Sequence, residues 1–508
     1  MSIVPIPNLK SLTRTFQPTL AWAPIWVLLG LIGLCLGIKV GGILRLAFPA
    51  GCFLTGLWLY FRYPALYLGF TWWVWFLTPC LRRMVDLQAG WLDPNPIMLA
   101  PFLTTLITLF TLMRHFPHMY RRGGLPFLLV ILAVGYGLLV GVINWSFIKP
   151  SVPLLNWLVP VLFGFHLFAN WRHYPLYRRV IQRLFLWGVF VMGSYGIIQY
   201  LVAPAWDRLW LMNQDTQVFG IPEPLGIRVF STMNSTQPFA CVMAAGLILL
   251  LSDRDRTKFL AAGVGYLSFL LTLARSAWLG WFVSLIFFVP SLKRRLQLRL
   301  VLTILVMTIL VLPLTAVDPF ATVINSRLQS LFNIGHDVSF NARSAGYSQA
   351  LGMVLNEFIG QGLGGTIISE YLGANDSGIL SLLFLLGWFG TLPYLTGLGL
   401  LLLSLIRPME AGDDPFAAAA RAIALGTFAQ IGLNESMLGV FGMVLWGFLG
   451  MALSAQRYYY WQQRYQLLDD AAELGALLNA SVICPHPQPF SLGRREREIL
   501  FPRPLGEG

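Results

Sequence analysis

Charged residues are scarce in this sequence. Only 11% of its 508 residues are Asp, Glu, Lys or Arg, whereas 56% are hydrophobic and the mean hydropathy is +0.67. Soluble domains carry about 25% charged residues. A chain with so little charge cannot cover a water-facing surface. The composition therefore excludes an ordinary soluble protein and indicates that lipid surrounds most of the chain.

Cysteine pairs and acidic clusters are also lacking. The five cysteines are scattered, four of them lie in apolar runs, and none forms a Cys-x-x-Cys pair (Cys35, Cys52, Cys80, Cys241 and Cys484). This pattern argues against a disulfide framework and against a cysteine metal site. No Asp-rich cluster of the kind that binds Mg²⁺ is present either. We therefore expect no metal and no other cofactor.

What the sequence does have is a series of long apolar runs. About 20 apolar residues cross a bilayer as a helix, so we predict an all-α, polytopic membrane bundle of about 12–14 transmembrane helices. The candidate spans are 20–38, 42–60, 64–81, 97–114, 124–143, 153–170, 180–203, 237–252, 258–274, 277–290, 299–316, 378–406, 417–433 and 436–455.

The net charge of +13 indicates a topology rather than a nucleic-acid partner. From residue 114 onward, loops that hold 16 basic residues alternate with loops that hold only 6. The positive-inside rule assigns the basic loops to the cytoplasm. The outer face then receives 204–235, 275–276, 317–377 and 434–435, and Arg82 and Arg83 depart from the rule.

We expect one integral membrane domain, 20–457, between a cytoplasmic N-terminal segment, 1–19, and a cytoplasmic tail, 458–508. After residue 484 the tail mixes Pro, Arg and Glu without apolar periodicity, so we expect it to be largely disordered. In the long outer loop 317–377, apolar residues at helical spacing predict an amphipathic helix over 344–358.

Three arginines in the predicted outer loops are candidates for binding an anionic substrate: Arg228, Arg275 and Arg343. Arg275 lies between two apolar runs, where a charge is costly unless it faces a cavity or a partner. A guanidinium binds phosphate through two N–H groups at once. We predict that the three bind a diphosphate without a metal. The alternative is an arginine at a helix end for Arg275 and ordinary loop charges for the other two.

Two carboxylates are candidates for acting on an acceptor hydroxyl. Asp376 precedes the run 378–406, and Glu435 lies in Asn434-Glu435-Ser436 between two runs. Either could take the proton from the hydroxyl or orient it. The alternative for Asp376 is capping of the helix that follows.

The long outer loop also carries the candidate turn residues. Asp337 and Ser339 precede Arg343, and Gly362 and Gly364 lie in Gly360-Gln-Gly-Leu-Gly-Gly365. Such glycines permit a tight turn or bring backbone N–H groups to an anion. The alternative is a loop that re-enters the membrane.

Over roughly 220–395 these stretches resemble the O-antigen ligase and Wzy-type polymerase superfamily of bacterial membrane enzymes. Arg228-Val-Phe-Ser-Thr-Met-Asn is similar to the family's Arg-x-x-Gly-Thr-Phe-x-Asn-Pro-Asn, and Ala274-Arg-Ser-Ala-Trp278 is similar to its Ser-Arg-(Gly/Ser)-Ala-Trp. Asp337-x-Ser-x-x-x-Arg343 and the glycines resemble its large periplasmic loop. Asp376-Ser-Gly-Ile-Leu380 resembles the start of the helix after that loop.

The sequence departs from the family pattern at two places. Ligases of this family typically have His-Asn where Asp376-Ser377 stands, and the Asp-Ser-Gly form is more similar to the polymerases. Ser231 stands where the family commonly has Gly, and Ser235-Thr236 stands in place of Pro-Asn. The first departure favours a polymerase over a ligase.

The resemblance implies an inverting, metal-independent glycosyl transfer at the outer, periplasmic face of the bacterial plasma (inner) membrane. The donor would be an undecaprenyl-diphosphate-linked oligosaccharide, and the product a cell-envelope glycan such as exopolysaccharide or O-antigen. Arg228, Arg275 and Arg343 would hold the diphosphate and stabilise the leaving group, while Asp376 or Glu435 would serve the acceptor. Membrane lipids and other polysaccharide-assembly proteins are the expected partners.

A small-solute, bicarbonate-like transporter is the alternative from another class. Transporters place ionisable groups near the middle of the membrane and often show repeats. This sequence concentrates such groups in loops and shows no repeat, which favours the enzyme.

Overall fold

A computed structural model of the protein describes residues 19–120, 123–214, 219–252, 257–291, 294, 297–298, 301, 351–352, 354–365, 377–406 and 414–482, with the backbone alone for 466–482. The chain divides into two compact units, of which the first ends at Tyr459 and the second begins at Tyr460. The described residues form helices and no strand, apart from an isolated antiparallel bridge between Gly220 and Ile227. The predicted all-α class is therefore confirmed.

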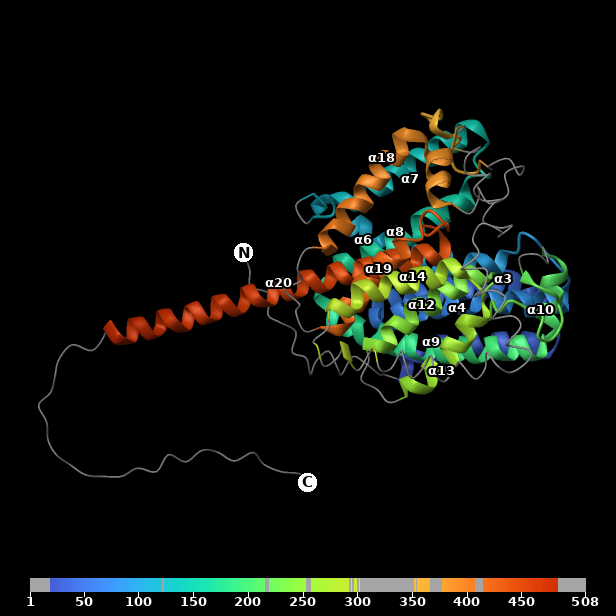
Figure 1. Cartoon of the computed structure of the whole chain (residues 1–508), viewed down its shortest axis with the longest axis horizontal. Helices are drawn as coiled ribbons and strands as arrows, with labels where there is room; N and C mark the ends of the chain where they lie inside the picture. Colours follow the sequence, from blue (N-terminus) through green and yellow to red (C-terminus); the bar gives the residue numbers. More distant parts are fainter. Residues whose placement is uncertain are drawn as a thin grey trace, which may run out of the picture. The chain divides into compact units, whose positions relative to one another are not determined.

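The helices that matter below follow the chain as shown in Figure 1. Their bounds are α2 Ala23–Gly37, α3 Leu44–Arg62, α4 Pro64–Ala89, α5 Leu99–Leu106, α6 Leu109–His115, α7 Leu125–Asn144, α8 Ser151–Ala169, α9 Tyr174–Val202, α10 Ala205–Met212, α12 Thr236–Ser252, α13 Lys258–Leu271, α14 Arg275–Phe288, α18 Gly378–Ile406, α19 Pro415–Phe428 and α20 Gly439–Val482. Within the described part, eight helical stretches are long and apolar enough to cross a membrane, and three further apolar helices are shorter. The chain is a multi-pass membrane protein in character, as predicted.

Each predicted span that falls on described residues coincides with helical structure, although the bounds differ. The run 97–114 is divided at Ile107 and Thr108 into α5 and α6. The threonine hydroxyls there donate to carbonyls three or four residues earlier, which competes with regular helix bonding (Thr104, Thr105 and Thr108). The run 299–316, apart from residue 301, and most of the predicted helix 344–358 lie outside the described residues.

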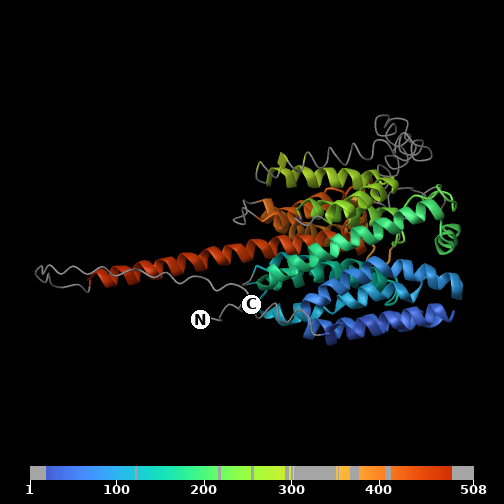
Figure 2. The same cartoon turned by 90° about the horizontal axis from the view of Figure 1, so that it is seen from below.

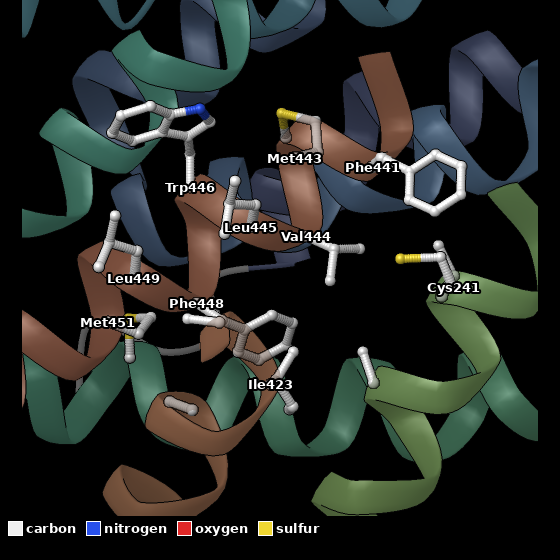
Figure 3. Packing of buried hydrophobic residues seen from close by; sticks show 14 of the residues in the cluster. Cys241, Ile423, Phe441, Met443, Val444, Leu445, Trp446, Phe448, Leu449 and Met451 are labelled. Carbon is white, nitrogen blue, oxygen red and sulfur yellow. The ribbon is translucent and has the colours of Figure 1, made fainter. Parts of the chain in front are cut away.

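The first half of α20 lies in the hydrophobic core of the first unit. Figure 3 shows Val444 and Phe448 of α20 in one cluster with Cys241 of α12 and Ile423 of α19. Lipid-exposed helices gain little from the hydrophobic effect when they associate, so close packing at small residues matters more. A Cβ atom at Gly450 would lie 2.3 Å from the carbonyl oxygen of Gly164 in α8, so the two backbones pack in direct contact.

Helices α14 and α19 pack in the same way and run antiparallel. A Cβ at Gly426 would lie 1.9 Å from Ser284 Oγ, and a Cβ at Gly280 would lie 2.0 Å from Gln430 Nε2. From one contact to the next the position changes by four residues on each of the two segments, which is the spacing of residues on one face of a helix. Small residues on each helix therefore allow the close approach that the site depends on.

Helix α18 is interrupted at Gly387, which has φ 57° and ψ −171°, a conformation essentially restricted to glycine. The Gly-rich segment 358–365 inserts at this break. Gln361 N and Gly362 N each donate to a carbonyl of α18, over 2.9 Å to Phe384 O and Leu385 O. In a lipid environment unpaired backbone groups cost several kcal/mol, so the inserted segment stabilises the broken helix.

The other side of the same segment contacts α7, which lies beside α18 (Figure 1). Leu363 N donates to Gly137 O over 2.8 Å, and a Cβ at Gly141 would lie 2.3 Å from Leu363 O. At the end of α7, Asn144 Nδ2 and Trp145 Nε1 donate to the carbonyl of Gln361. Segment 358–365 is thus a loop inserted between two helices.

The helices of the first unit, drawn from a second direction in Figure 2, have two chemically different ends. We call one the basic end, where Arg178 contacts Asp414 and Arg421 contacts Ser291. At the other, the site end, Arg83 contacts Ser231 and Asp207. Which end faces the cytoplasm stays a prediction.

The exception that Arg82 and Arg83 make to the charge pattern has a structural explanation. Both side chains are buried and paired with acids, Arg82 with Asp86 at 3.3 Å and Asp93 at 2.9 Å, and Arg83 with Asp207 at 3.0 Å. The positive-inside rule concerns Lys and Arg in loops, whereas these two lie within α4 and are neutralised. This pairing also lets α4 continue to Ala89, beyond its apolar run.

The break in α18 generates a stability prediction. Gly387→Ala should lower the midpoint of thermal unfolding in detergent, because the backbone conformation alone costs about 1–3 kcal/mol for a non-glycine residue and the new Cβ would lie 2.4 Å from Phe358 O. Gly399→Ala on the same helix is the matched control, since a Cβ there meets nothing within 4 Å. Equal midpoints for the two variants would contradict the proposed insertion.

Candidate functional site

The site end is organised around a buried ion pair between α4 and α10. Arg83 Nε lies 3.0 Å from Asp207 Oδ1, and both side chains have no solvent exposure. The same guanidinium donates to two backbone carbonyls, over 2.6 Å to Met233 O and 2.5 Å to Ser231 O. Arg83 thereby fixes the segment 228–235, which carries the first of the family-like motifs.

Asp207 is bound by further donors that connect it to the same segment. Tyr195 Oη donates to Asp207 Oδ2 over 2.7 Å, and Gln199 Nε2 donates to it over 2.9 Å. The carbonyl oxygen of the Gln199 side chain accepts from Phe230 N at 3.0 Å and Ser231 N at 2.7 Å. Each polar group in this buried network is therefore tied to a neighbour, as a low-dielectric interior requires.

Ser231 has φ 51°, in the left-handed region that disfavours residues other than Gly, Asn and Asp. It is held there by Arg83 and Gln199 and by its own hydroxyl, which donates to Met192 O over 2.6 Å. A strained residue persists only where its surroundings over-determine it. The chain direction after Arg228 is therefore rigidly set.

Arg228 ties this segment to the junction between α13 and α14. Val229 N donates to Leu271 O over 3.1 Å, and the Arg228 side chain donates to Thr272 O at 3.4 Å and Leu273 O at 3.1 Å. The side chain is half-buried. Two of the predicted phosphate-binding arginines are thus brought together, because Arg275 begins α14 directly after this junction.

Arg275 occupies the first turn of α14, where the helix dipole adds to its positive charge. Its side chain is half-buried. The next residue, Ser276, is buried and donates through Oγ to Gln237 Oε1 of α12 over 3.0 Å. The start of α14 is therefore fixed against α12, and its polar first turn lies at the site end.

Glu435 belongs to the connection between α19 and α20, which packs on the start of α18. Ser381 Oγ donates to Glu435 Oε1 over 2.9 Å, and Gly378 N donates to Ile431 O over 2.9 Å. Ser377, buried with no exposure, accepts from Leu380 N and so caps α18.

The packing of α14 on α19 brings the arginines toward Glu435. Ser284 lies against Gly426, and Gly280 lies against Gln430. If the same step of four residues continues on both helices, Ser276 comes opposite Asn434, and these two are the neighbours of Arg275 and Glu435. The connection keeps helical bonding that far, since Asn434 N donates to Gln430 O over 2.8 Å. Arg228, Arg275 and Glu435 therefore lie at the same end of the helices, and we take them together as the candidate site.

Several predicted residues do not join this group. Gly362 and Gly364 lie in the segment inserted between α7 and α18, where the N–H groups of Gln361, Gly362, Leu363 and Gly365 donate to carbonyls. These glycines permit close backbone approach, and the N–H groups around them already form hydrogen bonds within the fold. Asp337, Ser339, Arg343 and Asp376 lie outside the described residues, so their roles stay predictions.

Sequence reasoning missed a set of buried polar residues that line the same end. They are Ser276, Ser381, Gln430 and Asn434, together with the half-buried Gln237, and Asn434 donates to Gln430 Oε1 over 3.2 Å. Their signal is a spacing of four: Ser276, Gly280 and Ser284 on one helix, and Gly426, Gln430 and Asn434 on the other. Small or polar residues at this spacing in an apolar helix mark a face that packs on protein rather than lipid.

Comparison with known proteins adds no identification, because no protein-family model and no curated protein matches the chain. Among the residues that the structure describes, no group of three or more His, Cys, Asp or Glu side chains is arranged to hold a metal ion. The metal independence expected from the sequence stays a prediction.

The buried pair gives a second testable prediction. Arg83→Met leaves Asp207 charged and buried, which costs roughly 3–5 kcal/mol when one partner of such a pair is removed, so the variant should unfold at a lower denaturant concentration in mixed micelles. Arg83→Met combined with Asp207→Leu should cost less than the two single changes together. Arg62→Gln, at an exposed position on α3, is the control. Equal stability of Arg83→Met and Arg62→Gln would show that the pair does not hold the site end.

Proposed function

We propose that this protein is a membrane glycosyltransferase of the O-antigen ligase and Wzy-type polymerase kind, which acts on a lipid-diphosphate-linked oligosaccharide. The observation that supports the proposal is that Arg228, Arg275 and Glu435, which come from three stretches far apart in the sequence, lie at the same end of the helices. Two of the three stretches are those that carry the family-like motifs.

The backbone at Ser231 also supports the family proposal. The motif that Arg228-Val-Phe-Ser resembles commonly has Gly at the fourth position, and Ser231 has the positive φ that Gly adopts without strain. A conformation that favours Gly at the position where the family has Gly is expected if the two segments fold alike. A random resemblance gives no reason for it.

The chemistry follows from the charges at the site. The acceptor hydroxyl oxygen forms a bond to the anomeric carbon while the bond from that carbon to the diphosphate oxygen breaks, with inversion at the carbon. The hydroxyl proton passes to a carboxylate, for which Glu435 and Asp376 are the candidates. Arg275 stabilises the negative charge that develops on the leaving diphosphate, which is where fixed cations accelerate such a reaction most.

Arg228 has a different part in this scheme. Its donors to Thr272 O and Leu273 O hold the turn from which Arg275 projects. It therefore acts first as a positioning residue for Arg275, and its charge adds to the potential at the diphosphate.

Polymerisation of repeat units is the preferred form of the reaction, because Asp376-Ser377 stands where ligases typically have His-Asn. Transfer to another acceptor, as in a ligase, uses the same donor and the same arginines. The two are distinguished by product: a polymerase makes long lipid-linked chains, whereas a ligase transfers existing chains.

Arg275 gives the third prediction. In proteoliposomes supplied with an undecaprenyl-diphosphate oligosaccharide, Arg275→Ala should reduce chain elongation by about 10²–10³-fold, as loss of one charge-stabilising donor does. Arg275→Lys should retain part of the activity, because it keeps the charge but not the paired N–H groups. Arg208→Ala is the matched control, since Arg208 is exposed on α10 at the same end.

Unchanged chain elongation by the Arg275→Ala variant would contradict the proposed function. Transport of bicarbonate into vesicles that contain no lipid-linked sugar would instead favour the transporter alternative. Products of single repeat units joined to a second acceptor would favour a ligase.

Glu435 gives the fourth prediction. Glu435→Gln keeps an oxygen that can accept from Ser381 but removes the base, so turnover should fall by about 10²–10⁴-fold while donor binding is retained. Asp376→Asn is the parallel variant. If only Asp376→Asn loses turnover, the base is Asp376 and Glu435 positions the start of α18.

A further inference from the structure

A cavity of about 390 Å³ lies at the basic end, away from the candidate site, between α14, α18 and α19. Most of its wall is apolar, and the polar groups are Ser291, Asp414 and Arg421. This volume is in the range of small-molecule sites. The cavity therefore offers an apolar surface together with a cation.

Arg421 projects from α19 and is half-buried. One terminal nitrogen donates to Ser291 Oγ, and the other makes a long contact of 3.5 Å to Leu405 O. Its Nε–H is buried and has no hydrogen-bond partner among the described residues. Within that part of the chain it also forms no ion pair.

Asp414, the acid in the cavity wall, forms its contacts with residues other than Arg421. Its Oδ2 lies 3.0 Å from Arg178 Nη1 and accepts from Tyr174 at 2.6 Å and Tyr459 at 2.8 Å. Its Oδ1 accepts from Phe416 N over 3.0 Å and caps α19. The charge of Asp414 is balanced by Arg178, so no acid among the described residues neutralises Arg421.

The apolar wall opens toward the lipid-facing surface. Ile286 is 54% exposed, Phe287 41% and Ile406 61%, whereas Ala418 and Leu425 lie deeper and are buried. An exposed apolar surface on a membrane helix is covered by acyl chains. A ligand of this cavity must therefore be anionic at one end and apolar at the other.

We propose that this cavity binds an anionic phospholipid, with its phosphate at Arg421 and Ser291 and an acyl chain along Phe287, Leu425 and Ile406. Basic pockets between transmembrane helices bind anionic lipid head groups in this manner. The phosphate takes the donors of Arg421 and the hydroxyl of Ser291. The site is separate from the proposed catalytic residues and does not depend on their function.

The test measures lipid binding by the intact purified protein. Native mass spectrometry in detergent, with phosphatidylglycerol as probe, should show a bound lipid that Arg421→Gln weakens by about 10–100-fold, the loss expected for a charge-assisted bond. Arg183→Gln, an exposed arginine on α9 at the same end, should bind as the wild type does. Phosphatidylglycerol should raise the midpoint temperature of thermal unfolding of the wild type and of Arg183→Gln.

Two further variants keep the test decisive if Arg421→Gln folds poorly. Ala418→Phe fills the cavity but retains Arg421, and it should also lose the lipid. Arg421→Lys should retain more binding than Arg421→Gln because it keeps the charge.

Three results would overturn the proposal. Equal binding of phosphatidylcholine would remove the requirement for an anionic head group. Equal losses in Arg183→Gln and Arg421→Gln would indicate non-specific attraction to the basic end. Thermal stabilisation by inorganic phosphate alone, at the concentration at which the lipid acts, would make the ligand a free anion rather than a lipid.

Discussion

The buried pair of Arg83 and Asp207 is the constraint on which the site end depends. Two charges removed from water cost several kcal/mol each, and their attraction offsets this only when the remaining donors and acceptors are also bound. Here two carbonyls, Tyr195 and Gln199 complete the bonding. A network that is stable only when complete allows one arrangement of the loop that it binds. The strained φ of Ser231 and the direction of Arg228 both follow from that arrangement.

The same requirement for complete bonding explains the other unusual feature, the broken helix α18. Gly387 interrupts the helix where lipid offers no replacement hydrogen bonds, and segment 358–365 supplies them from its own backbone. Gly360 and Gly387 are needed because side chains there would separate the segment from α18, and a side chain at Gly362 would separate it from Gly141 of α7. In a soluble loop such a Gly-rich sequence suggests anion binding, whereas in segment 358–365 it has a structural role.

The helices were predictable from the sequence because lipid imposes a length and a composition that can be read directly from apolar runs, as α7 and α18 show. Arg228, Arg275 and Glu435 could be chosen as candidates from the sequence because a charge beside an apolar run is conspicuous. The polar residues Gln237 and Gln430 were missed because their role depends on which helices pack together. Arg82 and Arg83 were misleading for the same reason, since their partner acids lie up to 124 positions away along the chain, at Asp207.

The arginines at the two ends of the first unit differ in the groups that pair with their positive charge. At the site end, Arg45 and Arg82 pair with Asp86, Arg83 pairs with Asp207, and Arg228 donates to carbonyls. These cations are structural, so they say little about which side of the membrane this end faces. Arg421, at the basic end, makes no such pair within the described residues, although its neighbour Asp414 is fully bonded. A cation that the described part of the fold leaves to a lipid-facing cavity is available to a ligand. The arginines Arg82, Arg83 and Arg228 at the site end instead hold the fold together, and the proposal assigns the action on a substrate to Arg275.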